Sequence, residues 1–495
     1  MRVNSANAKW AAQEPAHASV AVQGLRQMTF YGPIIAAAAD LAFFPIAAGV
    51  AAMAIWRSAL SGKERRLLAG VMAVSVLVKI ALGSAADSVD VDFYRQYSNI
   101  LGHGGNLYAE TNYYNYGPVW QWVVAGFGRI AGSTGPQFHP WISAFLALVD
   151  ALIGAALARA YSPTAAIVFL ASPIGLIISG YYSQIDNIAV LFGLAGWLLI
   201  RKGNPGRRGF FVSSACVGVS LMVKHVLALF PIWLLFWKPL GKVRARLLYA
   251  ALAYGICAAS FAPWLQDPVS REGIARNVLK YSGEWGCSWI GYTIRLILPV
   301  GSLDSMLQAI HIAGGTETLW LAALVAAGVV LATRRPQELY LSYLLFLYAS
   351  SLAQHSYYCA IPMAAAAALF FLWESWAFLL AATLAIATQY NTLGYFLFRA
   401  APSLTIHGRS YAFAEVMGDP VYPFFVSASQ LCAGVLLYRL WKGAGETTGG
   451  KAPPVSVGSR RAVALVAVGG LPVFLVLARN LVAHFVFGRV MVFPP

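Results

Sequence analysis

The chain has 495 residues, of which 59% are hydrophobic and only 11% are charged. Soluble domains carry about a quarter charged residues, so this composition excludes an ordinary soluble protein and indicates a polytopic membrane protein. Basic residues give a formal net charge of +16. In a membrane protein such an excess reflects topology, so it does not call for nucleic acid as a partner. The five cysteines are scattered, with neither a zinc-binding spacing nor a disulfide framework.

Apolar runs of helical length predict an all-α bundle of about 11–14 spans, because a segment inside lipid must satisfy its own backbone hydrogen bonds. The predicted spans are 33–56, 66–85, 138–160, 164–182, 185–200, 210–237, 247–265, 317–333, 339–353, 358–373, 375–395, 421–441 and 462–487. Lys224 and His225 interrupt the run 210–237, which predicts a broken helix pair. Segments 117–132 and 289–300 are too short to span, and they predict in-plane or re-entrant helices.

The chain divides by composition into one large membrane domain with terminal additions. We expect an N-terminal tail over 1–30, a transmembrane domain over 31–442 with an outer catalytic loop at 86–117, a flexible Gly- and Pro-rich linker over 443–461, and a C-terminal membrane helix over 462–495. No internal repeat of fixed period is present in the sequence.

The distribution of basic residues predicts the topology. If loop 86–117 faces outward, the inward loops hold 20 of the 35 Lys and Arg residues. The outward loops then hold about eight, as the positive-inside rule requires. We therefore expect a multi-pass protein of a bacterial inner membrane, with loop 86–117 in the periplasm.

Three carboxylates, Asp87, Asp90 and Asp92, open this loop. The helix after them carries apolar residues at i, i+4, i+7 and i+8, a spacing that places them on one face. These residues are Phe93, Tyr97, Ile100 and Leu101. A plain N-cap role for Asp92 would explain one acid of the three. Crowded carboxylates are typical of a site for a cation, a proton or a polar substrate. Asp92 is the first candidate and Asp90 the second, whereas Asp87 reads as a solvated loop residue.

A second polar group lies at the boundary of two predicted spans and contains Tyr182, Gln184 and Asp186. Tyr182 could be an ordinary interfacial aromatic residue. An ionisable residue at the start of a span is a site hypothesis, because burying it costs free energy unless it has a partner. Lys224 could neutralise one of the acids, or it could be a lysine whose amine reaches the membrane surface.

Asp40, Lys79 and Asp150 lie inside other predicted spans, and their roles stay open at the level of sequence. Buried acids along a path through the bilayer would favour a transporter.

Basic residues are also predicted in the outward loops, where they are less common than in inward ones. They are Arg276, Lys280, Arg295 and His355. Each could be a solvated loop charge. Together, close to outward acids, they suit an anionic lipid headgroup: the carboxylates would handle a hydroxyl, and the cationic groups would bind a phosphate.

Several motifs, in this order, resemble the GT-C superfamily of membrane glycosyltransferases, which use polyprenyl-phosphate sugars as donors. The resemblance covers roughly residues 70–300 with interruptions. The first outer loop is similar through Asp92-Phe93-Tyr94, Gly102, Asn106-Leu107-Tyr108 and Tyr116-Gly117-Pro118. Asp90-Val91-Asp92 is similar to the acid pair of the glycosylphosphatidylinositol mannosyltransferase I branch.

A further stretch resembles the dolichyl-phosphate-glucose glucosyltransferases. It runs from Ser172-Pro173 through Gly180, Gln184 and Leu191 to Gly193-Leu194, followed by Lys224 and Glu284-Trp285-Gly286-Cys287-Ser288, with His355-Ser356-Tyr357-Tyr358 as a weaker anchor. Two positions depart from that branch, because Asn115 stands in place of a second acid and Tyr182 in place of histidine. These departures leave the branch, the sugar and the acceptor open.

The resemblance implies transfer of a hexose, mannose or glucose, from a polyprenyl-phosphate sugar to a lipid- or glycan-linked acceptor, with inversion. Asp92 would be the general base, and Asp90 would assist it or share a divalent cation, Mg²⁺ or Mn²⁺, with it. Tyr116, Tyr182, Gln184, Asp186 and Lys224 would contact the substrate or support the residues that do. Membrane lipids would surround the bundle. The alternative is a flippase for lipid-linked sugars or a polyprenyl transporter.

Overall fold

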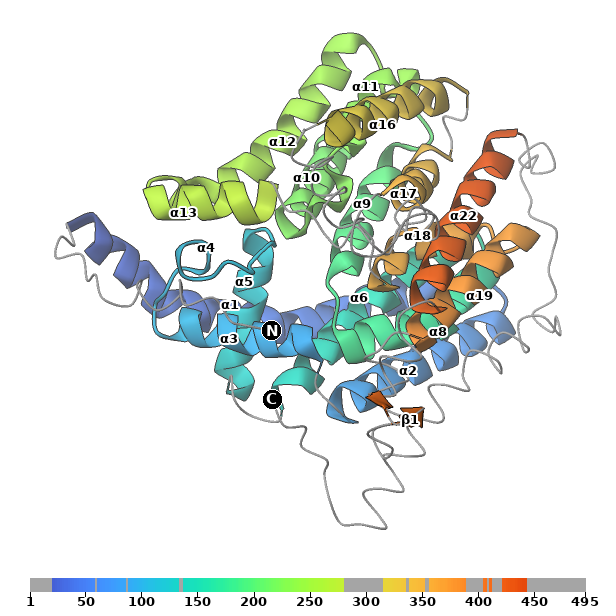
Figure 1. Cartoon of the computed structure of the whole chain (residues 1–495). Helices are drawn as coiled ribbons and strands as arrows, with labels where there is room; N and C mark the ends of the chain where they lie inside the picture. Colours follow the sequence, from blue (N-terminus) through green and yellow to red (C-terminus); the bar gives the residue numbers. More distant parts are fainter. Residues whose placement is uncertain are drawn as a thin grey trace.

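The protein is a bundle of helices, seen here in a computed structural model (Figure 1). The structure describes residues 20–57, 60–85, 88–132, 137–279, 315–334, 338–351, 356–388, 404–406, 409–411 and 421–442. The predicted segments 289–300, 443–461 and 462–495 lie outside these residues. Within them, the only strands are β1 (Leu404–Ile406) and β2 (Arg409–Tyr411), which pair antiparallel with Thr405 opposite Ser410.

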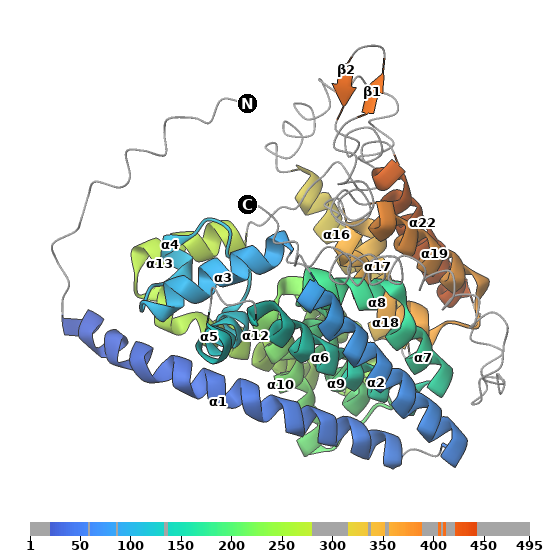
Figure 2. The same ribbon diagram turned by 90° about the horizontal axis from the view of Figure 1, so that it is seen from below.

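The first half of the bundle runs from α1 to α10. Its elements are α1 (Val20–Trp56), α2 (Gly62–Ala85), α3 (Val89–Gly102), α4 (Leu107–Glu110), α5 (Pro118–Ala131), α6 (Phe138–Ala160), α7 (Pro163–Ala171), α8 (Pro173–Ile177), the π-helical turn η3 (Ile178–Tyr182), α9 (Asp186–Ile200) and α10 (Arg207–Val223). Figure 2 shows α1 and α2 along one face of the bundle, with α6 beside them.

The second half begins with a short turn after Lys224. Its elements are η4 (His225–Leu227), α11 (Phe230–Phe236), η5 (Lys238–Leu240), α12 (Val243–Leu265), α13 (Pro268–Gly273), the π-helical η6 (Ile274–Leu279), α16 (Gly315–Arg334), α17 (Leu339–Ser350), η9 (Ser356–Cys359), α18 (Ala360–Ala368), α19 (Trp373–Thr388) and α22 (Val421–Lys442). Helices α17, α19 and α22 pack together at one side, and α13 lies against α4 at the other (Figure 1).

Among the described helices, five are long and apolar enough to cross a membrane. They cover Ala36–Trp56, Gly62–Ser84, Phe138–Ala160, Val243–Leu265 and Phe424–Lys442. Six shorter apolar helices of 10–17 residues accompany them. The all-α polytopic architecture is therefore as predicted, although several expected spans are represented, among the described residues, by helices shorter than a bilayer requires.

The predicted span 164–182 is broken rather than continuous. Its two parts, Pro163–Ala171 and Pro173–Tyr182, meet at an angle of 51°. Pro173 has no backbone N–H to continue the first helix, and the Ser172 hydroxyl accepts a hydrogen bond from the Ile174 amide to start the second. Lys224 ends α10 in an extended conformation, so the predicted break in 210–237 is confirmed.

Helix α1 begins at Val20, ten residues before the expected end of an N-terminal tail at residue 30. Its apolar span starts only at Ala36, so the helix continues beyond the hydrophobic segment that defined the predicted boundary. Hydropathy marks the part of a helix that lipid can surround, not the point where its hydrogen bonding begins.

Candidate active site

Helix α3 carries the acidic residues of loop 86–117, and its first residue is set by Ser88. The Ser88 hydroxyl accepts a hydrogen bond from the Val91 amide at 3.4 Å, so Ser88 and not Asp92 is the N-cap. The same hydroxyl donates to the Tyr182 carbonyl at 3.3 Å. The start of α3 is thereby tied to the η3 turn, which belongs to the other predicted polar group.

The buried face of α3 is displaced from the predicted one. Val91, Tyr94 and Tyr97 are buried, whereas Phe93 is only half-buried. These three residues follow one another at i, i+3 and i+6 and so form one packed face. Phe93, Ile100 and Leu101 flank this face and are partly buried against the same core, so the predicted apolar face is confirmed, with its centre displaced towards Val91 and Tyr94.

Asp90 and Asp92 point in different directions, since residues two apart on a helix lie about 200° from each other. The Asp92 side chain is 67% exposed, and its Oδ1 accepts a hydrogen bond from the Arg95 guanidinium at 3.2 Å. Asp90 is half-buried and lies close to Lys224, Gln184 and Asp186. Asp87 lies outside the described residues.

Lys224 and Asp186 form a buried ion pair beside Asp90. Lys224 Nζ lies 3.0 Å from the Asp186 carboxylate. The ammonium group also lies 5.7 Å from the ring centroid of Tyr116 and 5.1 Å from that of Tyr358, within the range of cation–π attraction. The neutralisation of an acid by Lys224, expected from the sequence, takes place at Asp186.

The break between α10 and η4 explains how Lys224 reaches this position. The Gly117 amide donates to the Val223 carbonyl at 3.0 Å, so loop 111–117 lies directly against the end of α10. A Cβ atom at Gly117 would lie 1.9 Å from the Met222 carbonyl oxygen, and only glycine allows this approach. The contact brings the Tyr116 ring over the Lys224 amine.

Tyrosines enclose the cluster. Tyr94 Oη lies 3.5 Å from Tyr116 Oη and donates to the Ser183 carbonyl at 3.3 Å. Burial raises the pKa of both tyrosines well above the usual value, so their hydroxyls stay protonated and can donate hydrogen bonds. Tyr182 is also buried, with its ring centroid 6.4 Å from that of Tyr357.

The electrostatics of the cluster set the protonation of Asp90. Burial raises the pKa of Asp90 to about 6, against the lowering effects of Lys224 and Gln184 and with a further rise from Asp186. Gln184 is close enough to favour the ionised carboxylate, although its Nε2 has no hydrogen-bond partner of standard geometry among the described residues. Above pH 6 the Asp90 carboxylate is therefore ionised and partly shielded from bulk water.

Three buried polar atoms of this region have no hydrogen bond of standard geometry within the described part of the chain. They are Nε2 of Gln184, a donor, and Oδ1 of Asn187 and of Asp186, both acceptors, of which the last lies 3.0 Å from Lys224 Nζ. A buried polar atom without a hydrogen bond costs free energy, so in native proteins such atoms are commonly satisfied by water or by a ligand. Both kinds of group are suited to hydroxyl-bearing ligands, which donate and accept.

The proposed phosphate-binding residues are only partly covered by the structure. Lys280, Arg295 and His355 lie outside the described residues. Arg276 is exposed, and its guanidinium donates to Asn277 Oδ1 at 3.2 Å and to Asn112 Oδ1. The Asn277 amide in turn donates to the Thr111 carbonyl at 3.0 Å. Arg276 therefore lies beside the same loop that carries Tyr116.

The residues do not fit a divalent cation held jointly by Asp90 and Asp92. The two carboxylates diverge, and Asp92 is paired with Arg95. No group of three or more His, Cys, Asp or Glu side chains that could hold a metal ion occurs among the residues that the structure describes. The described geometry gives no support to an ion shared by these two acids, and metal binding stays a prediction from the sequence.

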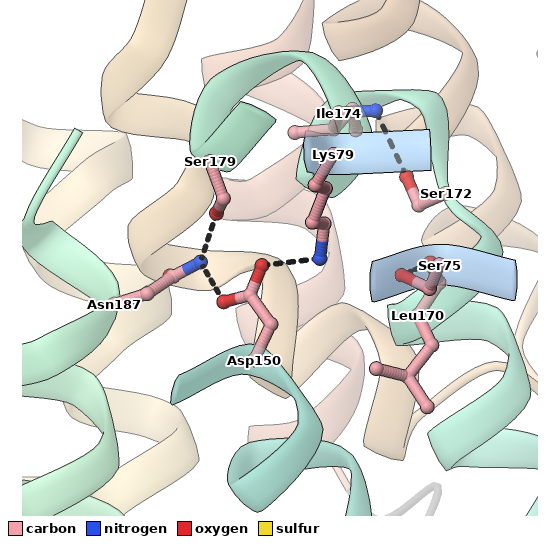
Figure 3. Close-up of polar contacts among 8 residues, drawn as sticks. All are labelled: Ser75, Lys79, Asp150, Leu170, Ser172, Ile174, Ser179 and Asn187. Atoms are coloured by element: carbon pink, nitrogen blue, oxygen red, sulfur yellow. Dashed lines mark hydrogen bonds and ion pairs between the residues drawn. The ribbon is translucent and has the colours of Figure 1, made fainter. Parts of the chain in front are cut away.

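The intramembrane charges do not form one path in the described part of the bundle. Lys79 and Asp150 pair with each other at 2.5 Å, and both are fully buried (Figure 3). Asp40 lies elsewhere, against α5, where a Cβ atom at Gly126 would be 2.1 Å from its Oδ2. The support that these residues gave to a transporter is correspondingly weak.

Tyr94, Ser88 and Ser183 are site residues whose contacts sequence analysis missed. A signal for Tyr94 was present, since it lies four residues after Asp90 and so shares its helical face. Ser183 had no such signal, because its backbone is left-handed, with φ of 54°, and links η3 to α9.

The composition and the fold define a polytopic helical membrane protein. No protein-family model matches the chain, and no curated protein matches it. Among solved structures, the chain is similar to the crystal structure of ArnT from Cupriavidus metallidurans bound to undecaprenyl phosphate, with 16% sequence identity and a TM-score of 0.42. The similarity covers 86% of this chain and 78% of that one. A likeness of this size assigns no family, so the function has to be argued from the site.

Proposed function

We propose that the protein is a GT-C-type glycosyltransferase of a bacterial inner membrane. It transfers a hexose, mannose or glucose, from a polyprenyl-phosphate sugar to a hydroxyl of a lipid- or glycan-linked acceptor at the periplasmic face. The observation that carries the proposal is the shielded Asp90 carboxyl, with its pKa of about 6, beside Lys224 and Asp186. Asp90 and Lys224 belong to the motifs that resemble the GT-C enzymes.

Asp90 is the proposed general base in preference to Asp92. A base works best when its pKa lies near the working pH and when water does not compete for it. Burial gives Asp90 both properties, whereas Asp92 is largely exposed and paired with Arg95. Asp92 and Arg95 would then face the solvent side of α3, where they could meet a polar part of a substrate.

The proposed reaction is a single displacement. The Asp90 carboxylate takes the proton of the acceptor hydroxyl, and the hydroxyl oxygen forms a bond to the anomeric carbon of the donor sugar. The bond between that carbon and the phosphate oxygen breaks, and the polyprenyl phosphate leaves with the electron pair. Attack opposite the leaving group inverts the anomeric configuration, and no covalent intermediate on the protein is needed.

The negative charge that develops on the leaving phosphate needs cationic donors. Arg276 is available beside loop 111–117, and Lys280, Arg295 and His355 complete the proposed set. Lys224 adds positive charge near the leaving phosphate while it stays paired with Asp186. Gln184, which lies beside Asp90, would bind a sugar hydroxyl.

The test is a transfer assay with purified protein in detergent and a synthetic polyprenyl-phosphate hexose. Formation of a glycosylated acceptor, with no turnover of a nucleotide hexose, supports the proposal. Movement of the intact lipid-linked sugar across vesicles without any new glycosidic bond would instead establish the flippase alternative. Failure to use any of a panel of polyprenyl-phosphate hexoses would overturn the donor class.

A further inference from the structure

Lys79, Asp150 and Asn187 form a buried network outside the cluster around Asp90. Asn187 is the sequence neighbour of Asp186, which belongs to that cluster. Lys79 Nζ lies 2.5 Å from Asp150 Oδ2, and the Asn187 amide donates to Asp150 Oδ1 at 2.7 Å (Figure 3). A longer contact of 3.4 Å joins the same amide to the Ser179 hydroxyl. Both oxygens of Asp150 are therefore engaged, and three helices, α2, α6 and α9, meet at one carboxylate.

The network fixes the first turn of α9. Asn187 follows Asp186 directly, so the hydrogen bond from Asn187 to Asp150 holds the turn from which Asp186 reaches Lys224. A fully buried ion pair resists separation, because moving one partner away leaves the other charge unpaired in a medium of low dielectric constant. The position of Asp186 is thus set by contacts of its neighbour Asn187, which lies about 100° further around α9.

The η3 turn is held by the same helices. A Cβ atom at Gly180 would lie 2.9 Å from the Lys79 Cα, so η3 packs on the backbone of α2 at Lys79 itself. The Gly180 carbonyl also accepts a hydrogen bond from the Ser143 hydroxyl of α6 at 2.7 Å. Two residues further on, the Tyr182 carbonyl accepts the hydrogen bond from Ser88, the cap of α3.

Two lines of contact therefore connect the Lys79–Asp150 pair to the proposed base. One runs through Asn187 to Asp186 and Lys224, and the other through η3 to the start of α3. We propose that Lys79, Asp150 and Asn187 are positioning residues that set the geometry of Asp90, Asp186 and Lys224. The inference rests on the proposed function for its catalytic meaning, but its geometry can be tested without turnover.

The readout is the protonation of Asp90. The groups that face this carboxyl are Lys224, Asp186, Gln184, Tyr94 and Tyr116. Lys224 and Gln184 favour the ionised form, and each has a larger effect than the opposing effect of Asp186, so loosening the whole cluster should raise the pH at which Asp90 titrates. The infrared band of the protonated carboxyl reports this pH, and the band is assigned by its loss in Asp90→Asn.

The first variant is Asn187→Ala, which breaks the link and leaves the ion pair in place. We expect the titration midpoint of Asp90 to rise by about one pH unit, a tenfold change in the protonation equilibrium. Where transfer is measurable, kcat should fall more than KM rises, and the acid limb of the pH profile should move with the infrared midpoint. Ser75→Ala is the matched control, because Ser75 lies on the same face of α2 and loses one buried hydrogen bond, to the Leu170 carbonyl at 2.8 Å. It should leave the midpoint unchanged.

The second variant replaces the pair by apolar residues of similar size, Lys79→Met with Asp150→Leu, a kind of change that buried ion pairs often tolerate. It should produce a shift at least as large, and adding Asn187→Ala to it should cause no further change, because Asn187 has then already lost its hydrogen bond to Asp150. An unchanged Asp90 midpoint in both folded variants would overturn the proposal and leave the network a packing feature. A shifted midpoint in a protein whose wild type transfers no sugar would sustain the positioning role and refute the proposed function.

Discussion

Asp90 and Asp92 lie two residues apart at the start of α3, and their carboxylates face different surroundings. Asp90 lies beside Lys224 and Asp186, whereas Asp92 is paired with Arg95 at the surface. The difference follows from the helical repeat alone, once Ser88 fixes the first residue of the helix. One short acidic motif therefore supplies a shielded carboxylate and a solvated one.

Asp90→Asn should abolish transfer while the protein stays folded. Asparagine keeps the size of the side chain but cannot accept the proton, so turnover should fall by about 10²–10⁴-fold. Asp92→Asn is the matched control and should keep most of the activity, because its carboxylate is 67% exposed and outside the cluster. The measurement is kcat with a polyprenyl-phosphate hexose, with thermal stability recorded in parallel. A strong loss in Asp92→Asn and none in Asp90→Asn would reverse the assignment of the base.

The pH dependence of transfer should show an acid limb near pH 6. The base must be ionised to accept a proton, and burial raises the pKa of Asp90 to about 6 from an ordinary 3.8. The profile of kcat/KM reports this group in the free enzyme. A limb near pH 4 would mean that the base is a solvated carboxylate.

The same pKa shift has a signature in folding stability. Between pH 3.8 and about 6 the native state binds more protons at Asp90 than the unfolded state does. The contribution of Asp90 to the free energy of unfolding therefore decreases as the pH rises through this window and is constant above it. Thermal unfolding of wild type and Asp90→Asn between pH 4 and 7 should differ in slope only in this window. Parallel curves would show that Asp90 titrates normally in the folded protein.

Removing the ammonium group of Lys224 should destabilise the protein strongly. Lys224→Met leaves Asp186 buried without its ion-pair partner, a change that typically costs about 3–5 kcal/mol. Adding Asp186→Asn should recover much of the stability, since no buried charge then remains unpaired. Activity should not recover, because the positive field that favours ionised Asp90 is gone. If Lys224→Met and the double variant were equally stable, Lys224 and Asp186 would not be buried away from water as they are in the structure.

Loop 86–117 should be accessible from the periplasm. A cysteine at Asn112, which is exposed, should react with a membrane-impermeant reagent in intact spheroplasts of a cysteine-free variant. A cysteine at Lys202, exposed at the end of α9, serves as the inward control and should react only after permeabilisation. The opposite labelling pattern would contradict the topology and, with it, the periplasmic site.

Much of the helical framework could be predicted from hydropathy, because apolar runs record which segments are buried or face lipid. The span 138–160 is confirmed by α6, and the break in 210–237 was visible from two polar residues inside an apolar run. The bend at Pro173 was missed because hydropathy does not change there. Proline was the signal, but its effect depends on whether a serine caps the next helix.

The sequence could predict which residues belong to the candidate site, but not how they contact one another. Gln184, Asp186 and Lys224 stood out as polar residues in apolar surroundings, and the structure brings the last two together. The choice between Asp90 and Asp92 depended on which face of α3 packs against the protein. Successive residues lie about 100° apart around a helix, so an error of one residue in the packed face changes which acid is buried. The pairing of Lys79 with Asp150 spans 71 residues and has no local signature.

That separation also constrains how the chain enters the membrane. Lys79 leaves the ribosome 71 residues before Asp150, and a lone lysine costs free energy on insertion, up to about 2.5–3.5 kcal/mol at the centre of a membrane helix. The span Gly62–Ser84, which contains Lys79, has a mean hydropathy of 2.1 and has to offset that cost until α6 arrives. The bent pair α7 to η3 follows, and neither part is long enough to cross alone. Contact between α2 and α6 in the membrane then removes the cost of the lone lysine, because it pairs Lys79 with Asp150.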